Sequence, residues 1–243
     1  MKRFLGNPRA THNHVAYRIA FIVVAMTFML VQAHAQTTKV KKPEPLGYGW
    51  ADKFLNEVYL LDVDVESSTK QIDDSRHYLV EMAEDPVVFL KNMGTSDFNA
   101  VVALSRQKFE QGKAAKKTID EIFADADFDT KIKKLGEQLN TLGDQKALSS
   151  IGKNIQAGIK NLETMPKTID KLTTRTKSII AQGDGVLKQA DQLDMFKKAP
   201  VVSTLSSSLG SLKGTAEKMP ALGDVSVKTL GLYKQVMSNI KIK

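Results

Sequence analysis

The stretch that decides the fold is DTKIKKLGEQLNTLGDQKALSSIGKNIQAGIKNL, residues 129–162. Steps of three and four positions separate its aliphatic residues, which are Ile132, Leu135, Leu139, Leu142, Leu148, Ile151, Ile155, Ile159 and Leu162. Such steps place apolar side chains on one face of a helix, and their regularity over this distance resembles a coiled-coil seam. We therefore predict amphipathic helices that pack lengthwise against other helices.

Upstream, helical spacing begins at Trp50 and continues through Phe54, Val58, Leu61, Val65, Ile72 and Leu79. Residues 61–66 (LDVDVE) alternate with period two, so a strand competes there, but their neighbours on both sides keep helical spacing. We predict helix throughout. Asp85-Pro86 is typical of an N-cap followed by proline at the first helical position, so this helix is expected to end near Glu84.

Two further helices are expected in the first half of the chain. A short one over residues 86–92 would stop at Met93-Gly94, and residues 95–97 would cap a longer one that continues from Phe98 through Ile119 to Phe123. The acidic run ADADFD, residues 124–129, is predicted to break the helix that precedes it.

The pattern Glu-x-Met-Pro occurs twice, at residues 163–166 and 217–220. Proline cannot donate an N–H, fixes its own φ and disfavours helical backbone at the preceding residue. Turns are therefore predicted at both sites, with a further break at Gly183-Asp-Gly185. The helices expected around these breaks cover residues 167–181, 185–198, 201–218 and 224–240.

A second echo, Lys-Thr-Ile-Asp, occurs at residues 117–120 and again at 167–170. The two echoes leave two interpretations open. One is a duplicated helical hairpin of about 50 residues, a size typical of helical repeats. The other is coincidence in a helical chain rich in Lys, Thr and Leu.

The fold predicted from these patterns is all-α, either an antiparallel helical bundle or an elongated stack of helical hairpins with coiled-coil-like packing in the middle. Aromatic residues gather in helices over 47–128, whereas residues 130–195 hold none, so aromatic-poor hairpins over 129–243 are expected to pack in the same domain. The residues we expect to be buried are Phe54, Val58, Leu61, Leu135, Leu139, Ile151, Ile155 and Leu162.

Residues 1–35 resemble a secretory signal peptide. Residues 1–18 carry four basic side chains and no acid, residues 19–31 are apolar, and Ala33-His34-Ala35 supplies small residues before a cleavage site. The apolar run is shorter than the ~20 residues that span a bilayer. Cleavage after Ala35 is predicted, an uncleaved membrane anchor being the alternative, and residues 36–46 are expected to form a flexible linker.

Composition excludes several function classes. The signal peptide holds four of the 35 Lys and Arg and none of the 27 Asp and Glu, so its removal lowers the net charge from +8 to +4. This mild excess does not indicate nucleic-acid binding. Without Cys the chain forms no disulfide, thiolate nucleophile or soft metal site. His77 is the only His beyond residue 35, which disfavours mechanisms that need several imidazoles.

Two groups of side chains have a spacing that could bind a metal ion. Asp125, Asp127 and Asp129 imitate the opening of a calcium loop, but Thr130 and Gly136 stand where that loop needs Gly and Glu, so an acidic linker is the favoured interpretation.

The second set is Asp73, His77 and Glu81, whose four-residue spacing places them on one helix face, where they could bind a divalent ion. Bundle metal sites of the carboxylate kind usually take Glu-x-x-His from more than one helix, and this sequence contains no such motif. We favour a solvated polar stripe with an Asp73–His77 pair.

The sequence contains no Gly-x-Ser-x-Gly and no phosphate-binding loop, so no catalytic, cofactor-binding or metal residue is assigned and no cofactor is expected. The predicted function is that of an exported, non-enzymatic helical protein, periplasmic or secreted, which acts as a binding or structural component of the cell envelope. Its partner would be a protein or an envelope lipid, not a nucleic acid, and self-association into a homo-oligomer stays open.

A membrane-active protein, lipid-binding or pore-forming, is the alternative class. Residues 201–221 are weakly polar, which suits an interfacial helix, but they hold no aromatic residue and include Lys213. Packing against sister helices is therefore favoured for this segment.

Overall fold

The computed structural model describes residues 40–112, 117–142 and 144–241, so the predicted signal peptide at 1–35 lies outside the described residues. Every regular element in the described part is a helix, which confirms the all-α prediction. The helices belong to one compact unit, residues 42–243. They are α2 (Gly49–Glu84), α3 (Pro86–Met93), α4 (Phe98–Glu110), α5 (Ile119–Ala124), α6 (Ala126–Leu142), α7 (Gln145–Ala190) and α8 (Met195–Asn239).

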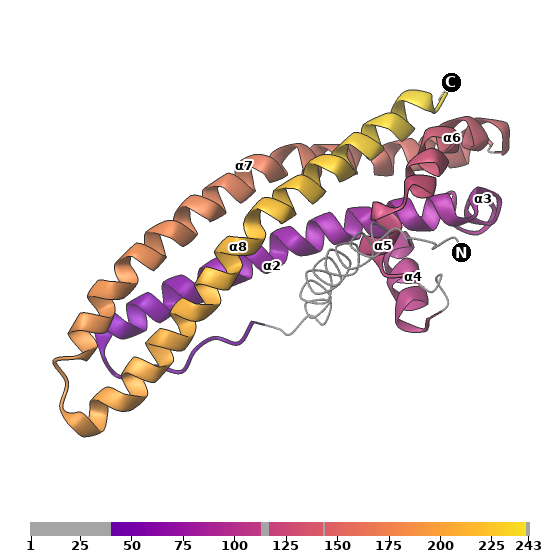
Figure 1. The fold of residues 1–243 in the computed structure, drawn as a ribbon. Coiled ribbons are helices and arrows are strands. Elements are labelled where there is room, and N and C mark those ends of the chain that lie inside the picture. Colours follow the sequence, from indigo (N-terminus) through magenta and orange to yellow (C-terminus); the bar gives the residue numbers. More distant parts are fainter. Residues whose placement is uncertain (1–39, 113–116, 143, 242–243) are drawn as a thin grey trace, which may run out of the picture. The chain divides into compact units, whose positions relative to one another are not determined.

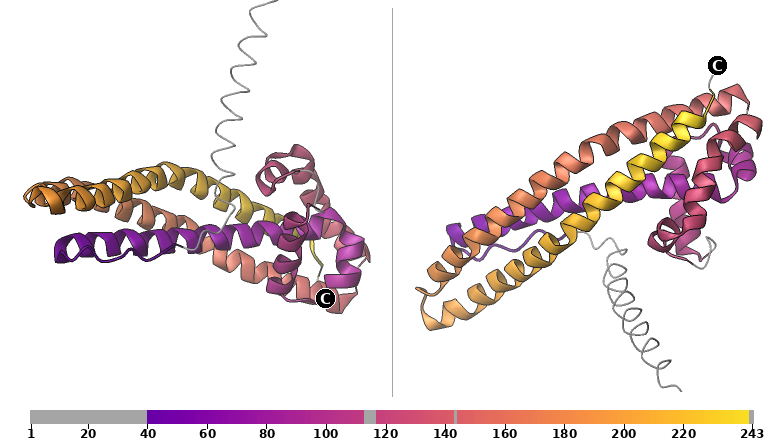
Figure 2. Two further views of the ribbon diagram at one scale, coloured as in Figure 1. Left: turned by 90° about the horizontal axis from the view of Figure 1, so that it is seen from below. Right: turned by 45° about the horizontal axis from the view of Figure 1, so that its top comes forward.

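Three long helices, α2, α7 and α8, form the bundle (Figures 1 and 2). A turn at residues 191–194 joins α7 to α8, and the two helices pack as an antiparallel hairpin. Asp64 of α2 pairs with Arg175, whereas Tyr78, further along α2, contacts Asn154, earlier on α7. α2 therefore runs antiparallel to α7 and parallel to α8. With 46 residues, α7 is roughly 70 Å long.

The four shorter helices pack around one end of this bundle, at the C-terminal part of α2 (Figure 1). We call it the covered end. There α4 and α5 contact α2, and α3 and α8 both contact α6. The start of α2 and the α7–α8 turn lie at the opposite end, where Figure 2 shows no helix other than the three long ones and the described stretch before α2 running back beside them.

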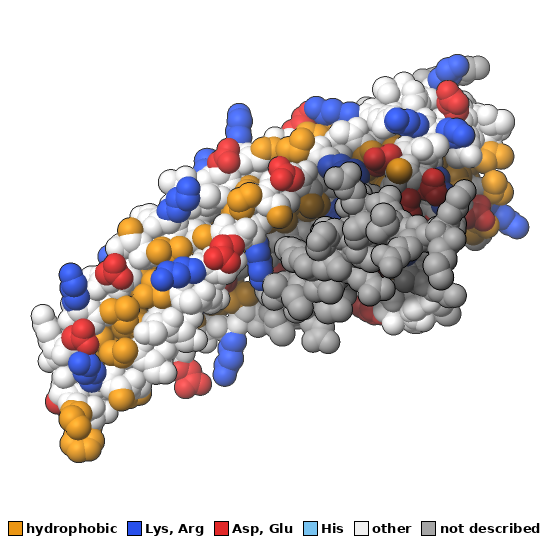
Figure 3. Space-filling view, in the orientation of Figure 1, with side chains coloured by type: hydrophobic (Ala, Val, Ile, Leu, Met, Phe, Trp, Pro, Cys, Tyr) orange, Lys and Arg blue, Asp and Glu red, His pale blue; other side chains and the backbone are white. Residues whose placement is uncertain are grey.

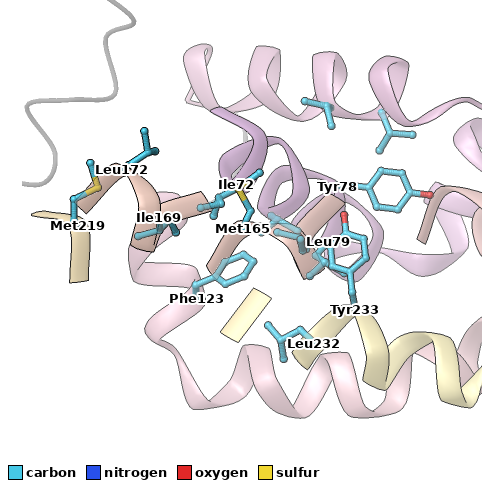
Figure 4. Packing of buried hydrophobic residues seen from close by; sticks show 14 of the residues in the cluster. Ile72, Tyr78, Leu79, Phe123, Met165, Ile169, Leu172, Met219, Leu232 and Tyr233 are labelled. Atoms are coloured by element: carbon cyan, nitrogen blue, oxygen red, sulfur yellow. The ribbon is translucent and has the colours of Figure 1, made fainter. Parts of the chain in front are cut away.

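The core runs between the long helices, and all eight residues predicted to be buried lie in it. Their exposed fractions do not exceed 6 %. Figure 4 shows another part of this core, where Tyr78 and Leu79 of α2 lie near Tyr233 of α8. The seam predicted from residues 132–162 is shared by α6 and α7, with Asp144 capping α7 through the backbone N–H of Ala147. Because each buried Leu or Ile contributes about 1.5–3 kcal/mol, lengthwise burial stabilises the bundle without disulfides.

Two fully buried tyrosines tie α2, α7 and α8 together at the covered end. Tyr233 of α8 donates a hydrogen bond from its hydroxyl to the carbonyl of Ser75 at 2.9 Å, and Tyr78 accepts one from Asn154 Nδ2 at 3.2 Å. Burial raises the pKa of both phenols, so they stay neutral. Gly158 makes room for Tyr233, because a Cβ there would lie 2.4 Å from the ring.

The prediction that Glu-x-Met-Pro marks turns is wrong at both sites. Pro166 lies inside α7 and Pro220 inside α8, so neither of the helices expected at 167–181 and 201–218 begins or ends where predicted. An interior proline costs roughly 3 kcal/mol. In α7, however, the turns around Pro166 bury Met165, Ile169 and Leu172, and each contributes about 1.5–3 kcal/mol. Continuing the helix therefore costs less than breaking it.

The predicted break at residues 183–185 is also wrong, and so is the helix predicted over 185–198. Gly183 is buried inside α7, where a Cβ would lie 2.2 Å from Leu209 Cδ2 of α8. This glycine provides close helix packing instead of a turn. The chain reverses after Ala190, and Asp194 caps α8 by accepting a hydrogen bond from the backbone N–H of Lys197. The helix predicted over 224–240 is likewise only the last part of α8.

The caps at Asp85 and Asp97 are confirmed, and residues 61–66 are helical as predicted. The single helix expected from Phe98 to Phe123 is wrong, because α4 ends at Glu110 and α5 begins anew at Ile119. Gly112 has a φ of 63°, and Thr118 forms a capping box with Glu121. Both are end signals that override the apolar spacing.

The Lys-Thr-Ile-Asp echo has two different structures. At residues 117–120 it precedes and starts α5, with Thr118 as the N-cap, whereas at 167–170 it lies in the middle of α7. The acidic break predicted over 124–129 shrinks to Asp125, because Ala126 already begins α6. The acidic side chains that follow occupy the first turn of α6, where the helix dipole favours negative charge.

Candidate functional site

The structure separates the three residues that the sequence placed on one face of the first helix. Asp73 pairs with Arg76, with 3.1 Å between Oδ1 and Nη1, so the predicted Asp73–His77 pair is wrong. His77 contacts Ser105 of α4, and Glu81 is buried and pairs with Lys108. Within residues 40–112, 117–142 and 144–241, no group of three His, Cys, Asp or Glu side chains is arranged to hold a metal ion.

His77 lies in the interface between α2 and α4 and is not part of a solvated stripe. Its Nδ1 lies 3.0 Å from Ser105 Oγ, and its ring meets Phe109 edge-on at 5.0 Å. Burial, and then the nearby Arg106 guanidinium, lower the pKa of His77 from 6.5 to about 4, although Asp74 opposes them. The imidazole is therefore neutral at pH 7. Ser105 is fully buried, which leaves this Ser–His pair without access for a substrate.

Arg76 is the centre of a second polar contact, which holds α5 onto α2. Its guanidinium is almost fully buried, pairs with Asp73 and Asp120, and lies 4.7 Å from the centroid of the Phe123 ring. Arg106 of α4 pairs with Asp74 in the same region. These charged groups form ion pairs that hold helices together. Their role here is therefore structural, although the same residue types can act in catalysis.

The acidic residues of the calcium-like pattern do not converge. Asp125 pairs with Lys117 and accepts a hydrogen bond from the backbone N–H of Asp127, so it caps the start of α6. Asp129 instead lies 3.4 Å from Lys228 Nζ of α8. The pattern serves helix capping and helix pairing.

Two depressions on the described surface are too small to nominate a site for a sizeable ligand. One, of about 220 Å³, is lined by residues 42–45 and the first turns of α2. The other, of about 300 Å³, lies between α2, α5 and α6, with Ile122 and Phe128 beside the Lys117–Asp125 pair. Ligand pockets typically enclose about 300–1,000 Å³, so both fall at or below the lower limit.

The most unusual surface lies at the α7–α8 turn. We define the hairpin tip as residues 191–198. Within it, Met195 is 83 % exposed and Phe196 is 93 % exposed, the highest values among the large hydrophobic residues of the described chain. Figure 3 shows hydrophobic side chains at the end of the molecule where Figure 1 places this turn.

Local capping explains why these two side chains point away from the core. Asp194 caps α8, so Met195 and Phe196 occupy its first turn, before any neighbouring helix covers them. Two ion pairs tie the rest of the tip together, Lys197 with Asp194 at 3.4 Å and Lys198 with Asp191 at 2.9 Å. The tip thus presents an apolar pair above charges that largely neutralise each other.

Sequence patterns did not reveal this surface, because residues 185–198 were predicted to form one helix. One signal could have found it. Phe196 is the first aromatic residue after Phe128, and it lies two residues after Asp194, a good N-cap residue. A helix that begins at Met195 places Phe196 in its first turn, next to the reversal of the chain.

None of the described helices has the combination of length and apolarity that crossing a bilayer requires. Comparison with protein-family models, with curated proteins and with solved structures finds no match to this chain. The geometry described above therefore carries the functional argument alone.

Proposed function

We propose that this chain is an exported, non-enzymatic helical protein that acts as a binding or structural component of the cell envelope, in the periplasm or secreted, and that the hairpin tip is its working surface. The observation that carries the proposal is the exposure of Met195 and Phe196 at the end of a long hairpin. Exposed apolar patches that the fold does not require commonly mark interaction sites.

The polar groups of the covered end support the non-enzymatic part of the proposal. Arg76 and Glu81 are buried in ion pairs between helices, and the His77–Ser105 contact is closed to solvent on the serine side. A catalytic constellation needs such groups aimed into a space that a substrate can enter. Because these side chains instead hold helices together, we expect them to stabilise the bundle and not to catalyse a reaction.

The export part rests on the sequence of residues 1–35, and protein chemistry tests it. The mature protein, recovered from its native envelope or medium, should begin at Gln36. A mature N-terminus upstream of that position would contradict cleavage after Ala35 and would favour the retained anchor.

Site-specific cross-linking tests the working surface. A photo-reactive residue at position 196 should capture a protein or a lipid in the envelope, and one at Val227, which is 56 % exposed on α8 but distant from the turn, should not. Serine at Met195 should reduce the capture at position 196. Equal capture at both positions would remove the tip from the proposal.

The alternative class, a membrane-active protein, is favoured by the same apolar pair. A lipid-binding protein needs only side chains that enter the interface, whereas a pore-former must rearrange helices to line a channel. The pair at the tip supports the first kind of activity.

A further inference from the structure

We infer that the occupant of the hairpin tip is the surface of a lipid bilayer, which Met195 and Phe196 enter while the rest of the bundle stays in water. This inference rests on the proposed function, since it names the partner of the working surface. It is carried by the exposure of the two side chains, the area of the patch, the charge around it and the aromatic residues at the same end of the bundle.

The area of the patch disfavours a protein partner. A large side chain such as Phe carries about 200 Å² of surface, so two residues exposed to 83 % and 93 % offer on the order of 350 Å². Stable protein–protein interfaces bury about 800 Å² on each partner. A fluid bilayer needs no matching pocket and no minimum area, so a small convex apolar tip suits it better.

The charge around the patch predicts which lipids are needed. Lys197 and Lys198 are paired with Asp194 and Asp191, and the flanking Lys188 and Asp184 carry opposite charges. The segment 184–198 therefore has no net charge and gains little from anionic lipid. Insertion should take place in zwitterionic membranes as well, because it is driven by apolar burial.

Two aromatic residues at the same end of the bundle suit the headgroup level of a membrane. α2 runs antiparallel to α7, so its first turn lies beside the last turns of α7, near the tip (Figure 1). Tyr48 and Trp50 lie there, partly exposed, with ring centroids 6.0 Å apart. Trp and Tyr are the side chains enriched at the headgroup level of membranes, behind residues that reach deeper.

The expected attachment is reversible. Two buried side chains of this size give a partition comparable to that of a single myristoyl chain, which binds membranes only marginally. The tip would therefore act as a contact that forms and breaks. Replacing Phe196 by a polar residue should weaken the contact, because it removes about half of the apolar area that the tip exposes.

The absence of Cys makes a direct test available. In the full chain, Met195→Cys carries an environment-sensitive fluorophore, and Ser207→Cys, exposed further along α8, carries the same label as a control. Each protein is mixed with phosphatidylcholine vesicles, and then with vesicles that also contain phosphatidylglycerol. Quenchers placed in the acyl chains report whether the label itself enters the bilayer, however residues 1–39 behave.

The inference expects the label at position 195 to shift to the blue and to be quenched with both kinds of vesicle, while the label at 207 stays in water. Adding Phe196→Ser should lower the partition of the 195 label roughly tenfold or more. A label at 195 that stays in water at saturating lipid would overturn the inference. Tip-dependent cross-linking to a protein would in that case leave the proposed function standing.

Self-association is the remaining outcome. If the fluorescence at 195 instead changes with protein concentration in the absence of vesicles, and Phe196→Ser abolishes that change, the occupant is a second copy of the chain. That result would overturn the lipid assignment. Circular dichroism on every variant ensures that the helical fold is intact in each comparison.

Discussion

At the covered end of the bundle, α2 is surrounded by α4, α5 and α6, and even the charged Arg76 and Glu81 are buried and paired. At the other end no short helix packs on the three long helices in the described part of the chain, where only residues 42–48 lie beside them, and Met195 and Phe196 face solvent. The difference teaches that one set of amphipathic helices can make a closed core where short helices cap it and an open apolar surface where none does. The predictions below test how far the two ends differ.

The largest effect is expected from Tyr233→Ala at the covered end. The change removes a fully buried ring and its hydrogen bond to Ser75, so the free energy of unfolding should fall by about 3–5 kcal/mol. Urea denaturation followed by circular dichroism measures it. Tyr233→Phe keeps the ring and should cost about 0.5–1.5 kcal/mol.

Leu209→Ala removes a smaller buried side chain nearer the tip. Leu209 is 8 % exposed and packs against Gly183 of α7, so about 2 kcal/mol is expected, the low end of the usual range. If this variant unfolds as easily as Tyr233→Ala, the two ends are equally well packed and the comparison fails.

Glycine substitutions sharpen the same comparison. Alanine at Gly158 places a Cβ against the rigid, buried ring of Tyr233, so a loss of about 1–3 kcal/mol is expected. Alanine at Gly183 meets the flexible end of Leu209, which can rotate, and the gain in helix propensity of up to about 1 kcal/mol offsets much of the clash.

Gly210→Ala provides the control, because a Cβ there meets nothing within 4 Å. It should stabilise the protein by about 0.5–1 kcal/mol. Thermal unfolding of the three variants should rank Gly158→Ala as the least stable and Gly210→Ala as the most stable. A ranking with Gly183→Ala lowest would mean that the tip half is the more rigid one.

The pH dependence of stability is expected to reside at the covered end. The pKa of His77 is about 4 in the folded protein and near 6.5 when unfolded, so the unfolded chain binds the proton first. Stability is complete above pH 6.5 and is lost as the pH falls toward 4. Such a shift corresponds to about 3 kcal/mol, which partial solvent exposure reduces to roughly 1–2 kcal/mol.

His77→Gln keeps a partner for Ser105 but cannot titrate, so the difference between the two proteins isolates the imidazole from the carboxylates around it. Denaturation at pH 7, 5.5 and 4.5 should show the wild type losing stability relative to the variant as the pH falls. Asp74 favours the protonated imidazole and Arg106 disfavours it. If the free energy of unfolding depends on pH in the same way in both proteins, His77 lies in solvent.

Features that depend on nearby residues were predicted correctly from the sequence, whereas features that depend on contacts between distant segments were not. Helical spacing predicted the buried residues correctly, and the caps at Asp85 and Asp97 were readable because a cap acts within one turn of chain. Pro166 and Gly183 were misread, since local rules predict breaks at both. Packing against residues of α8, such as Leu209, decides otherwise, and no local pattern contains that contact.

The exposure of the hairpin tip could not be predicted from the sequence for a related reason. A side chain is exposed when no element covers it, and which element covers residues 195 and 196 depends on where the hairpin turns. The helix predicted over 185–198 runs across the observed turn at residues 191–194, so Phe196 was placed inside a helix. The buried His77–Ser105 contact was equally hidden, because it depends on how α4 docks on α2.

The smallest effect on stability is expected from Phe196→Ser. This variant therefore tests whether the Phe196 ring packs on the bundle. A side chain that is 93 % exposed loses almost no packing when it is replaced, so the free energy of unfolding should change by less than about 0.5 kcal/mol. Phe89→Ser at the covered end, where the ring is 2 % exposed and packs edge-on against Tyr78, should cost at least about 3 kcal/mol. A clear loss of stability in Phe196→Ser would mean that the ring packs on the bundle, and the tip would then have no surface to offer.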